Sequence, residues 1–182
     1  MYNPNSHNQI KVVFTGCVGA GKTTAITTIS EKPPVSTEVK PSEASVIKRK
    51  ASTTVAMDYG ELTLDGGDKL YLYGTPGQRR FEFMTDILTK GALGLIVLID
   101  NSHENPLDEL DYYLNLNHRF LTDNPAVIGI THYDVASQPS VDDYYAALAE
   151  RGDPWPVIHV DARSAMDVKL LLDTLLAVLE FG

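Results

Sequence analysis

The stretch that decides the fold is IKVVFTGCVGAGKTT, residues 10–24, in which a β-branched apolar run leads into GCVGAGKT at 16–23. The second part matches the phosphate-binding pattern GxxxxGK[ST], and it stands where the pattern requires, after a predicted strand and at the start of a predicted helix. Glycines let backbone N–H groups turn inward around an anion, and the helix N-terminus adds positive potential. The segment therefore predicts a polyphosphate site built from Gly16, Val18, Gly19, Ala20, Gly21, Lys22, Thr23 and Thr24.

Individual side chains of this loop have distinct predicted roles. Lys22 is expected to hold the β and γ phosphates, and Thr23 is expected to ligate Mg²⁺. The side chain of Val18 is expected to face the γ phosphate and the attacking water, which predicts slow intrinsic turnover. Cys17 lies in a place that suits a small residue, so we expect it to pack and to have no chemical role.

Outside the loop, strand-like apolar runs alternate with helical patterns along the whole chain. The runs are 10–16, 54–64, 69–74, 93–100, 126–131 and 156–161. The turn at 65–67 joins two of them by too few residues for a parallel crossover, so these two strands should pair antiparallel. The prediction is an α/β, three-layer P-loop NTPase sandwich: a mostly parallel six-stranded sheet with one antiparallel strand and helices on both faces.

Helix starts are marked by three local signals. Asn105 followed by Pro106 supplies a cap and a first-turn proline, while 140–143 and 164–167 each place an acid three residues after a serine. We find no repeat or linker, so we expect one domain over 10–182 after a flexible N-terminus at 1–9. The long irregular stretch 33–52 is expected to be a functional or mobile loop.

Composition excludes several classes of protein. The chain has 182 residues, 43% of them hydrophobic, and a net charge of −9, which disfavours binding to nucleic acid or anionic lipid. With a single cysteine and five histidines at no metal-ligand spacing, no structural zinc site is expected, and a reducing, cytoplasmic setting is the simplest interpretation. The termini carry no signal-peptide or lipidation pattern, so we expect no direct membrane anchor.

From about Ile10 to Phe181 the chain resembles a Ras-type small GTPase. TTVAMDYG (53–60) is similar to the second strand of that family, and KLYLYGTPGQRRF (69–81) is similar to its second switch. The resemblance implies that Thr54 contacts Mg²⁺ and the γ phosphate, that Gly77 donates its N–H to that phosphate, and that Gln78 positions the attacking water. The implied catalytic residues are thus Gln78, Lys22 and Thr54. The implied metal ligands are Thr23 and Thr54.

The same resemblance implies where the nucleobase binds. THYD (131–134) stands where the family carries NKxD, and DARSA (161–165) stands where it carries the SAK element. The implied contacts are Thr131, His132, Asp134, Ala162 and Arg163. Because a carboxylate only accepts hydrogen bonds, Asp134 suits guanine better than adenine, so the implied ligands are GTP and GDP, with Mg²⁺ as cofactor.

The sequence also departs from the family. Gly74 stands in place of the Asp that normally supports Mg²⁺ through water, and Thr131 and His132 replace Asn and Lys. A TPGQ switch without that Asp is similar to the bacterial MglA-like GTPases and the related conservon GTPases. This resemblance implies a cytoplasmic nucleotide switch with a Roadblock/LC7-type regulatory protein as partner.

Two other interpretations remain open at this stage. Asp100 follows a run of apolar residues at a strand end, as the magnesium-holding Asp does in phosphate-loop ATPases and small-molecule kinases. Alternatively, Val18 and Gly74 are compatible with a scaffold that binds nucleotide without hydrolysing it. Arg79 and Arg80 follow the predicted switch glutamine and are expected to serve surface interaction more than catalysis.

Overall fold

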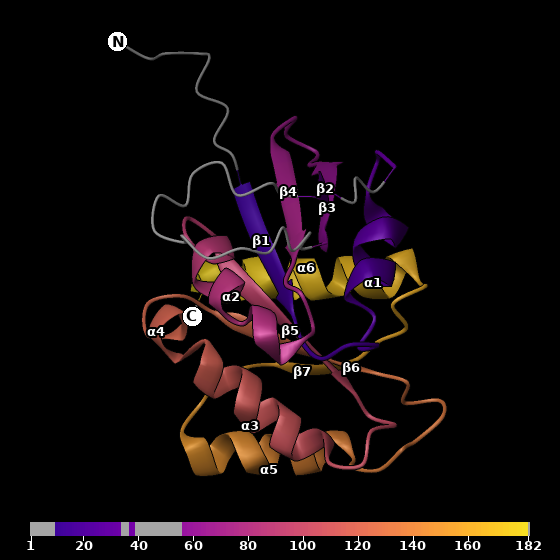
Figure 1. Ribbon diagram of the computed structural model, residues 1–182, viewed down its shortest axis with the longest axis vertical. Coiled ribbons are helices and arrows are strands. Elements are labelled where there is room, and N and C mark those ends of the chain that lie inside the picture. Colours follow the sequence, from indigo (N-terminus) through magenta and orange to yellow (C-terminus); the bar gives the residue numbers. More distant parts are fainter. Residues whose placement is uncertain (1–9, 34–36, 39–55, 182) are drawn as a thin grey trace, which may run out of the picture.

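The computed structural model describes residues 10–33, 37–38 and 56–181, and it contains one seven-stranded sheet. The strand order is β2-β3-β4-β1-β5-β6-β7, and Figure 1 labels the elements. The strands are β1 (Ile10–Thr15), β2 (Thr37–Glu38), β3 (Ala56–Thr63), β4 (Lys69–Gly74), β5 (Gly94–Asp100), β6 (Ala126–Thr131) and β7 (Val157–His159).

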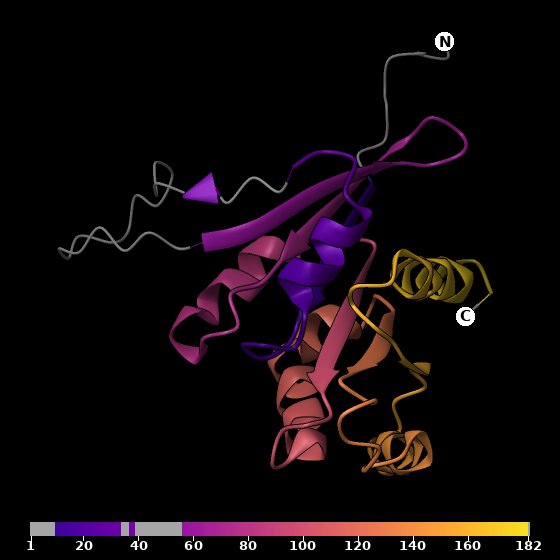
Figure 2. The same ribbon diagram turned by 90° about the vertical axis from the view of Figure 1, so that its right-hand side faces the viewer.

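The predicted sheet is confirmed, with one short strand added. Strands β1, β4, β5, β6 and β7 pair in parallel, and β3 runs antiparallel to β4. The turn that joins β3 to β4 is closed by hydrogen bonds between Leu64 and both Gly67 and Asp68, as the short connection requires. The addition is β2, a two-residue strand that pairs with the outer side of β3. Figure 2 shows the β3–β4 hairpin extending past the neighbouring helices.

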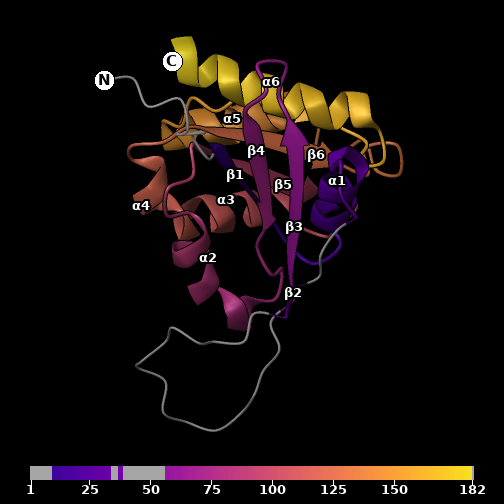
Figure 3. The ribbon, with the colours of Figure 1, turned by 90° about the horizontal axis from the view of Figure 1, so that it is seen from above.

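Helices cover both faces of the sheet. They are α1 (Lys22–Ile29), α2 (Phe83–Leu88), α3 (Pro106–Leu116), α4 (His118–Leu121), α5 (Val141–Arg151) and α6 (Ala165–Phe181), with a 3₁₀ turn, η1, at Arg79–Phe81. Side chains of α1 and α6 share one apolar core with the sheet, and side chains of α2, α3 and α5 share the other. Figure 3 shows α6 along one side of the strands and α2 on the other. The three-layer sandwich is therefore confirmed.

Alternation along the central strands explains why both faces are buried. Ile96 and Leu98 of β5 enter the core beneath α6, whereas Leu95, Val97 and Ile99 enter the opposite core. All seven residues of β5 are buried, as expected for a strand between two helical layers. The strand ends that carry the candidate site are thus anchored in a closely packed interior.

Helix boundaries follow the local signals with one difference. Ser140 and Asp143 form the reciprocal capping box at the start of α5, which ends at Gly152 in the left-handed conformation. Pro106 begins α3, as predicted, but the side chain of Asn105 makes no capping hydrogen bond. None of the helices in the described part of the chain is long and apolar enough to cross a bilayer.

The predictions for 1–9, for most of 33–52 and for Thr54 fall outside the described residues.

Candidate nucleotide site

The predicted phosphate loop connects β1 to α1 at the carboxyl end of the sheet. Gly16 has φ 139°, and a Cβ atom there would lie 2.1 Å from the carbonyl oxygen of Leu98, so only glycine fits. Gly19 and Gly21 also have positive φ, at 88° and 93°. The N-cap of α1 is Gly21, which provides no side-chain cap, so the first helical N–H groups remain available to an anion.

Lys22 lies across this loop. Its side chain is buried, and Nζ donates hydrogen bonds to the carbonyl oxygens of Gly16 at 2.7 Å and Cys17 at 2.5 Å. Burial lowers the pKa of Lys22 below its usual value. An ammonium has three N–H donors and these carbonyls engage two, so the third can meet a phosphate oxygen at the loop.

Thr23 meets a carboxylate that the sequence interpretation missed. The Thr23 hydroxyl donates a 2.6 Å hydrogen bond to Oδ2 of Asp58 on β3. Asp58 pairs with Gly74 in the β3–β4 register, and a Cβ atom at Gly74 would lie 3.0 Å from this same Oδ2. A carboxylate thus lies beside Gly74 on the neighbouring strand, and two oxygen atoms of the kind that Mg²⁺ prefers stand side by side.

The segment after β4 lies directly on the phosphate loop. A Cβ atom at Gly77 would be 2.6 Å from the backbone nitrogen of Val18, so no side chain fits between the two segments. The side chain of Val18 is 60% exposed, and that of Gln78 is also exposed. Gln78, the predicted water-positioning residue, therefore comes directly after Gly77, where the two segments lie closest.

The residues that follow are held against α3. The guanidinium of Arg79 lies over the ring of Tyr112, 4.4 Å from its centroid. The hydroxyl of the same tyrosine donates a hydrogen bond to the carboxylate of Glu82. Arg79 is thus engaged within the chain, against the Tyr112 ring of α3.

A pocket of about 530 Å³ opens beside the loop, a volume within the usual range of small-molecule sites. Three segments form it: the phosphate loop with α1, the loop after β6, and the loop between β7 and α6. Among the predicted base and phosphate contacts, the pocket lining includes Gly19, Gly21, Thr24, Thr131, His132, Asp134, Ala162 and Arg163. Tyr133 and His159 also line the pocket, and their rings stack with centroids 5.2 Å apart.

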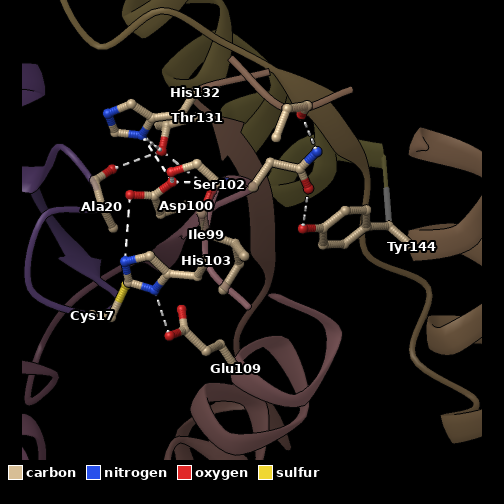
Figure 4. Close-up of polar contacts among 12 residues, drawn as sticks. Cys17, Ala20, Ile99, Asp100, Ser102, His103, Glu109, Thr131, His132 and Tyr144 are labelled. Atoms are coloured by element: carbon tan, nitrogen blue, oxygen red, sulfur yellow. Dashed lines mark hydrogen bonds and ion pairs between the residues drawn. The ribbon is translucent and has the colours of Figure 1, made fainter. Parts of the chain in front are cut away.

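Thr131 connects the pocket to the phosphate loop. It is buried, and its hydroxyl lies 3.1 Å from the carbonyl oxygen of Ala20 and 3.2 Å from that of Ile99. His132 follows with φ 55°, a left-handed backbone that is uncommon outside glycine and typical of functional sites. Figure 4 shows both side chains beside Asp100.

Asp134 and Arg163, the two charged residues predicted to contact the base, differ in their surroundings. Asp134 is exposed on the pocket wall. Arg163 is paired with Asp161, donating from Nε to Oδ1 and from Nη2 to Oδ2, each at 2.8 Å. These hydrogen bonds lower the pKa of Asp161 to about 2. The guanidinium is thus committed to Asp161, which leaves Asp134 as the charged group available to a base.

Asp100 is engaged by Ser102, His132 and His103. It accepts hydrogen bonds from the backbone and hydroxyl of Ser102 at 2.9 and 2.6 Å. It also lies 3.1 Å from Nδ1 of His132 and 3.5 Å from Nε2 of His103 (Figure 4). Among the described residues, the carboxylate recorded next to Thr23 is that of Asp58.

Comparison with known proteins supports nucleotide binding by this chain. Residues 36–181 match the family described as "conserved hypothetical ATP binding protein". That match begins after the phosphate loop, so the loop and the family are separate observations.

Two curated relatives give shorter matches. An uncharacterized protein of Methanocaldococcus jannaschii is 36% identical over 95 residues, covering 52% of this chain and 53% of the relative. Ras-related protein Rab-18 of Lymnaea stagnalis is 28% identical over 121 residues, covering 65% of this chain and 54% of the relative. The chain spans about half the length of these curated relatives.

The phosphate loop, the sandwich and the similarity to a Rab protein agree with one another. They confirm the predicted relationship to P-loop, Ras-like nucleotide-binding proteins. By the match over 36–181, the chain belongs to the family of conserved hypothetical ATP binding proteins.

Proposed function

We propose that this protein is a guanine-nucleotide switch that hydrolyses GTP to GDP slowly and is regulated by a partner. The observation that carries the proposal is the continuity between the phosphate loop and the 530 Å³ pocket, where Asp134 faces the space for a base. A carboxylate accepts hydrogen bonds from the two N–H groups on one edge of guanine, whereas adenine presents an acceptor there. The family description names ATP, which makes ATP the competing ligand.

Phosphate recognition follows from the loop. The backbone N–H groups at the start of α1 and the ammonium of Lys22 would neutralise the phosphate oxygens. Mg²⁺ would be held by Thr23 with Asp58 in support, together with Thr54 by resemblance, and it would offset charge on the β and γ phosphates. The Thr23 and Asp58 oxygens fit such an ion.

Hydrolysis needs a positioned water more than covalent chemistry. Gln78 is the side chain proposed to orient that water in line with the γ phosphate. Val18 is exposed in the same loop and would restrict the space for a transition-state group, which would make the intrinsic rate slow. Rate enhancement would then come from a regulator.

The switch itself would be the contact between Gly77 and the phosphate loop. A γ phosphate needs room and an N–H donor at this place, where the backbone of Gly77 now lies against Val18. Triphosphate binding would therefore move the segment after β4, and loss of the γ phosphate would let it return.

A partner would respond to that movement. Phe83 and Ile87, one helical turn apart on α2, are each 54% exposed close after Gln78. By resemblance to MglA-like GTPases, the proposed partner is a Roadblock/LC7-type protein.

Two further candidates are separated by the same experiments. An ATPase or small-molecule kinase using Asp100 is favoured by the nearness of this carboxylate to the loop, since a Cβ atom at Gly19 would lie 4.0 Å from Asp100 Oδ2. A scaffold without hydrolysis is favoured by the exposed Val18. Neither assigns a role to both Gln78 and Asp134.

The test combines binding and single-turnover measurements on the full chain. GTP and ATP compete against a fluorescent nucleotide with and without Mg²⁺, and the expected result is preference for GTP. Asp134→Asn should weaken GTP binding by at least about tenfold, since hydrogen bonds to a charged group are worth roughly 1.5–3 kcal/mol, and should favour xanthosine triphosphate, whose extra oxygen accepts from the amide. Asp123→Asn, at an exposed acid outside the pocket lining, is the matched control.

Phosphate release in a single turnover then tests hydrolysis. Gln78→Leu should slow release by at least about tenfold without weakening binding. Preference for ATP would overturn the guanine assignment. Absence of release, with or without a regulator, would remove the hydrolase assignment in favour of the scaffold. Loss of magnesium-dependent binding in Asp100→Asn with full turnover in Gln78→Leu would favour the kinase-like candidate.

A further inference from the structure

Three metal-ligating side chains from distant parts of the chain meet behind the phosphate loop. They are Cys17 in the loop itself, His103 after β5 and Glu109 in the first turns of α3. Sγ of Cys17 lies 3.7 Å from Nδ1 of His103, and Nδ1 lies 2.7 Å from Oε1 of Glu109. The donor atoms of all three residues lie within 4.8 Å of one another. Figure 4 shows His103 between the other two.

These distances suit a shared ion. A tetrahedral zinc ion binds sulfur at about 2.3 Å and nitrogen or oxygen at about 2.0–2.2 Å, which separates neighbouring donors by roughly 3.3–3.6 Å. The sulfur–nitrogen pair already has about this spacing. The nitrogen–oxygen pair, now at 2.7 Å, must open by about 0.6–0.7 Å, which a rotation of the Glu109 carboxyl group supplies.

Glu109 provides a separate indication of a ligand. Its second oxygen, Oε2, is buried and has no hydrogen-bond partner among the described residues. An unsatisfied carboxylate oxygen is costly to bury, and native structures normally provide it with a donor, a water or an ion. The hydrogen bond between His103 and Oε1 leaves this oxygen free to bind a cation.

The second ring nitrogen of His103 lies beside a carboxylate. This nitrogen, Nε2, is 3.5 Å from Oδ2 of Asp100, and Asp100 accepts a hydrogen bond from the hydroxyl of Ser102. In metal sites, the ligating histidine donates its other ring N–H to a carboxylate, which sets the tautomer and orients the ring. Here Asp100 would hold the proton on Nε2 and leave the lone pair of Nδ1 for an ion.

We propose that Cys17, His103 and Glu109 bind a thiophilic divalent transition-metal ion of the Zn²⁺ type, with Asp100 positioning His103 and a fourth ligand position left to water. Thiolate and imidazole favour such an ion over Mg²⁺, which prefers oxygen ligands. On binding, the Cys17 thiol loses its proton to solvent, and the proton by which Nδ1 of His103 bonds to Glu109 in the metal-free chain also leaves Nδ1, so that the ring proton stands on Nε2. Sulfur and Nδ1 then bind the metal, and the thiolate and the carboxylate balance the two positive charges.

The proposal is separate from the phosphate site and does not depend on the guanine assignment. The carbonyl oxygen of Cys17 accepts a hydrogen bond from Lys22, so an ion at this place also restrains the phosphate loop from behind.

The test is metal binding by the 182-residue chain, reduced and stripped with chelator, in the absence of nucleotide. Zn²⁺ is titrated in competition with a chromophoric chelator, and Co²⁺ is used as a spectroscopic probe. The expected results are one equivalent of bound ion and a thiolate-to-cobalt charge-transfer band that is lost in Cys17→Ser. His103→Ala and Glu109→Gln should each lower affinity by at least about tenfold, and Asp100→Asn by about ten- to a hundredfold.

The matched control is His118→Ala, since His118 lies at the exposed start of α4 and its Nδ1 bonds to the backbone carbonyl of Asn115. This variant should bind Zn²⁺ as the parent chain does. Circular dichroism checks that each variant is folded, and the isosteric Glu109→Gln keeps the test valid if His103→Ala is unstable. Equal affinity in His103→Ala and His118→Ala, or a cobalt complex without a thiolate band, would overturn the proposal.

Discussion

The hydroxyl of Thr23 donates a 2.6 Å hydrogen bond to the carboxylate of Asp58, which lies opposite Gly74 in the β3–β4 pair. We expect Asp58→Gly to weaken magnesium-dependent nucleotide binding by about ten- to a hundredfold, as loss of an outer-sphere metal partner does. The measurement is a Mg²⁺ titration of nucleotide affinity.

A swap across the strand pair makes this prediction specific. Gly74→Asp alone should destabilise the chain, because its Cβ would lie 3.0 Å from both Cβ and Oδ2 of Asp58. The double variant Asp58→Gly, Gly74→Asp removes the contacts with Asp58, leaves the flexible end of Ile26 at 3.1 Å, and should recover most of the Mg²⁺ dependence. Asp65→Asn, in the exposed hairpin turn, is the control. Failure of the double variant to improve on Asp58→Gly would contradict the assignment.

Gly77→Ala tests the contact between the two phosphate-facing segments. The new Cβ would lie 2.6 Å from the Val18 nitrogen, and backbone atoms cannot move aside cheaply. We expect the free energy of unfolding to fall by about 1–3 kcal/mol, the usual cost of overpacking, and triphosphate affinity to fall with it. Chemical denaturation measures the first effect. Gly66→Ala, where a Cβ meets nothing within 4 Å, should be neutral, and equal effects of the two substitutions would count against the contact.

Thr131→Val tests how the base pocket is tied to the loop. The substitution keeps the shape of the side chain but leaves the carbonyl oxygen of Ala20 without its hydroxyl donor in a buried place. Stability should fall by about 1–3 kcal/mol, and nucleotide affinity should fall because the loop loses an anchor. Thermal unfolding and nucleotide titration measure the two effects. Thr122→Val removes an exposed hydroxyl bonded to His118 and should change neither.

The pair formed by Asp161 and Arg163 predicts a pH dependence. The folded pKa of Asp161, about 2, lies below its ordinary value of 3.8, so the pair contributes stability above pH 3.8 and this contribution is lost as pH falls through about 2. The carboxyl chemical shift of Asp161 in a ¹³C NMR titration should show this low midpoint. In Arg163→Gln the midpoint should return towards 3.8, whereas an unchanged midpoint would exclude the guanidinium as the cause.

Most of the fold could be predicted because local signals agree with one another. The six apolar runs became strands within a few residues of their expected ends, and the 140–143 signal became a capping box. The phosphate loop could be predicted because its residues are contiguous in the sequence and its glycines are required by the backbone conformation. The added strand β2 has only two residues, too few for a period-2 pattern to be recognised.

The site was harder to predict wherever it depends on register or on distant contacts. Asp58 follows no motif, and its position beside Thr23 emerges only from the pairing of β3 with β4. Cys17 and His103 are 86 residues apart, so spacing rules for metal ligands could not connect them. A signal for Asp58 was nevertheless present: the tight turn at 65–67 fixes the hairpin register, and counting back from it sets 58 opposite 74.

The β3–β4 register has a consequence for how such proteins are recognised. Neighbouring antiparallel strands hold facing residues at nearly the same place, so an acidic group can change strands while the surface it helps to build keeps its chemistry. A signature written along one strand scores that change as a loss. Searches for related chains should therefore score positions 58 and 74 as one paired column, in which an acid on either side counts as present.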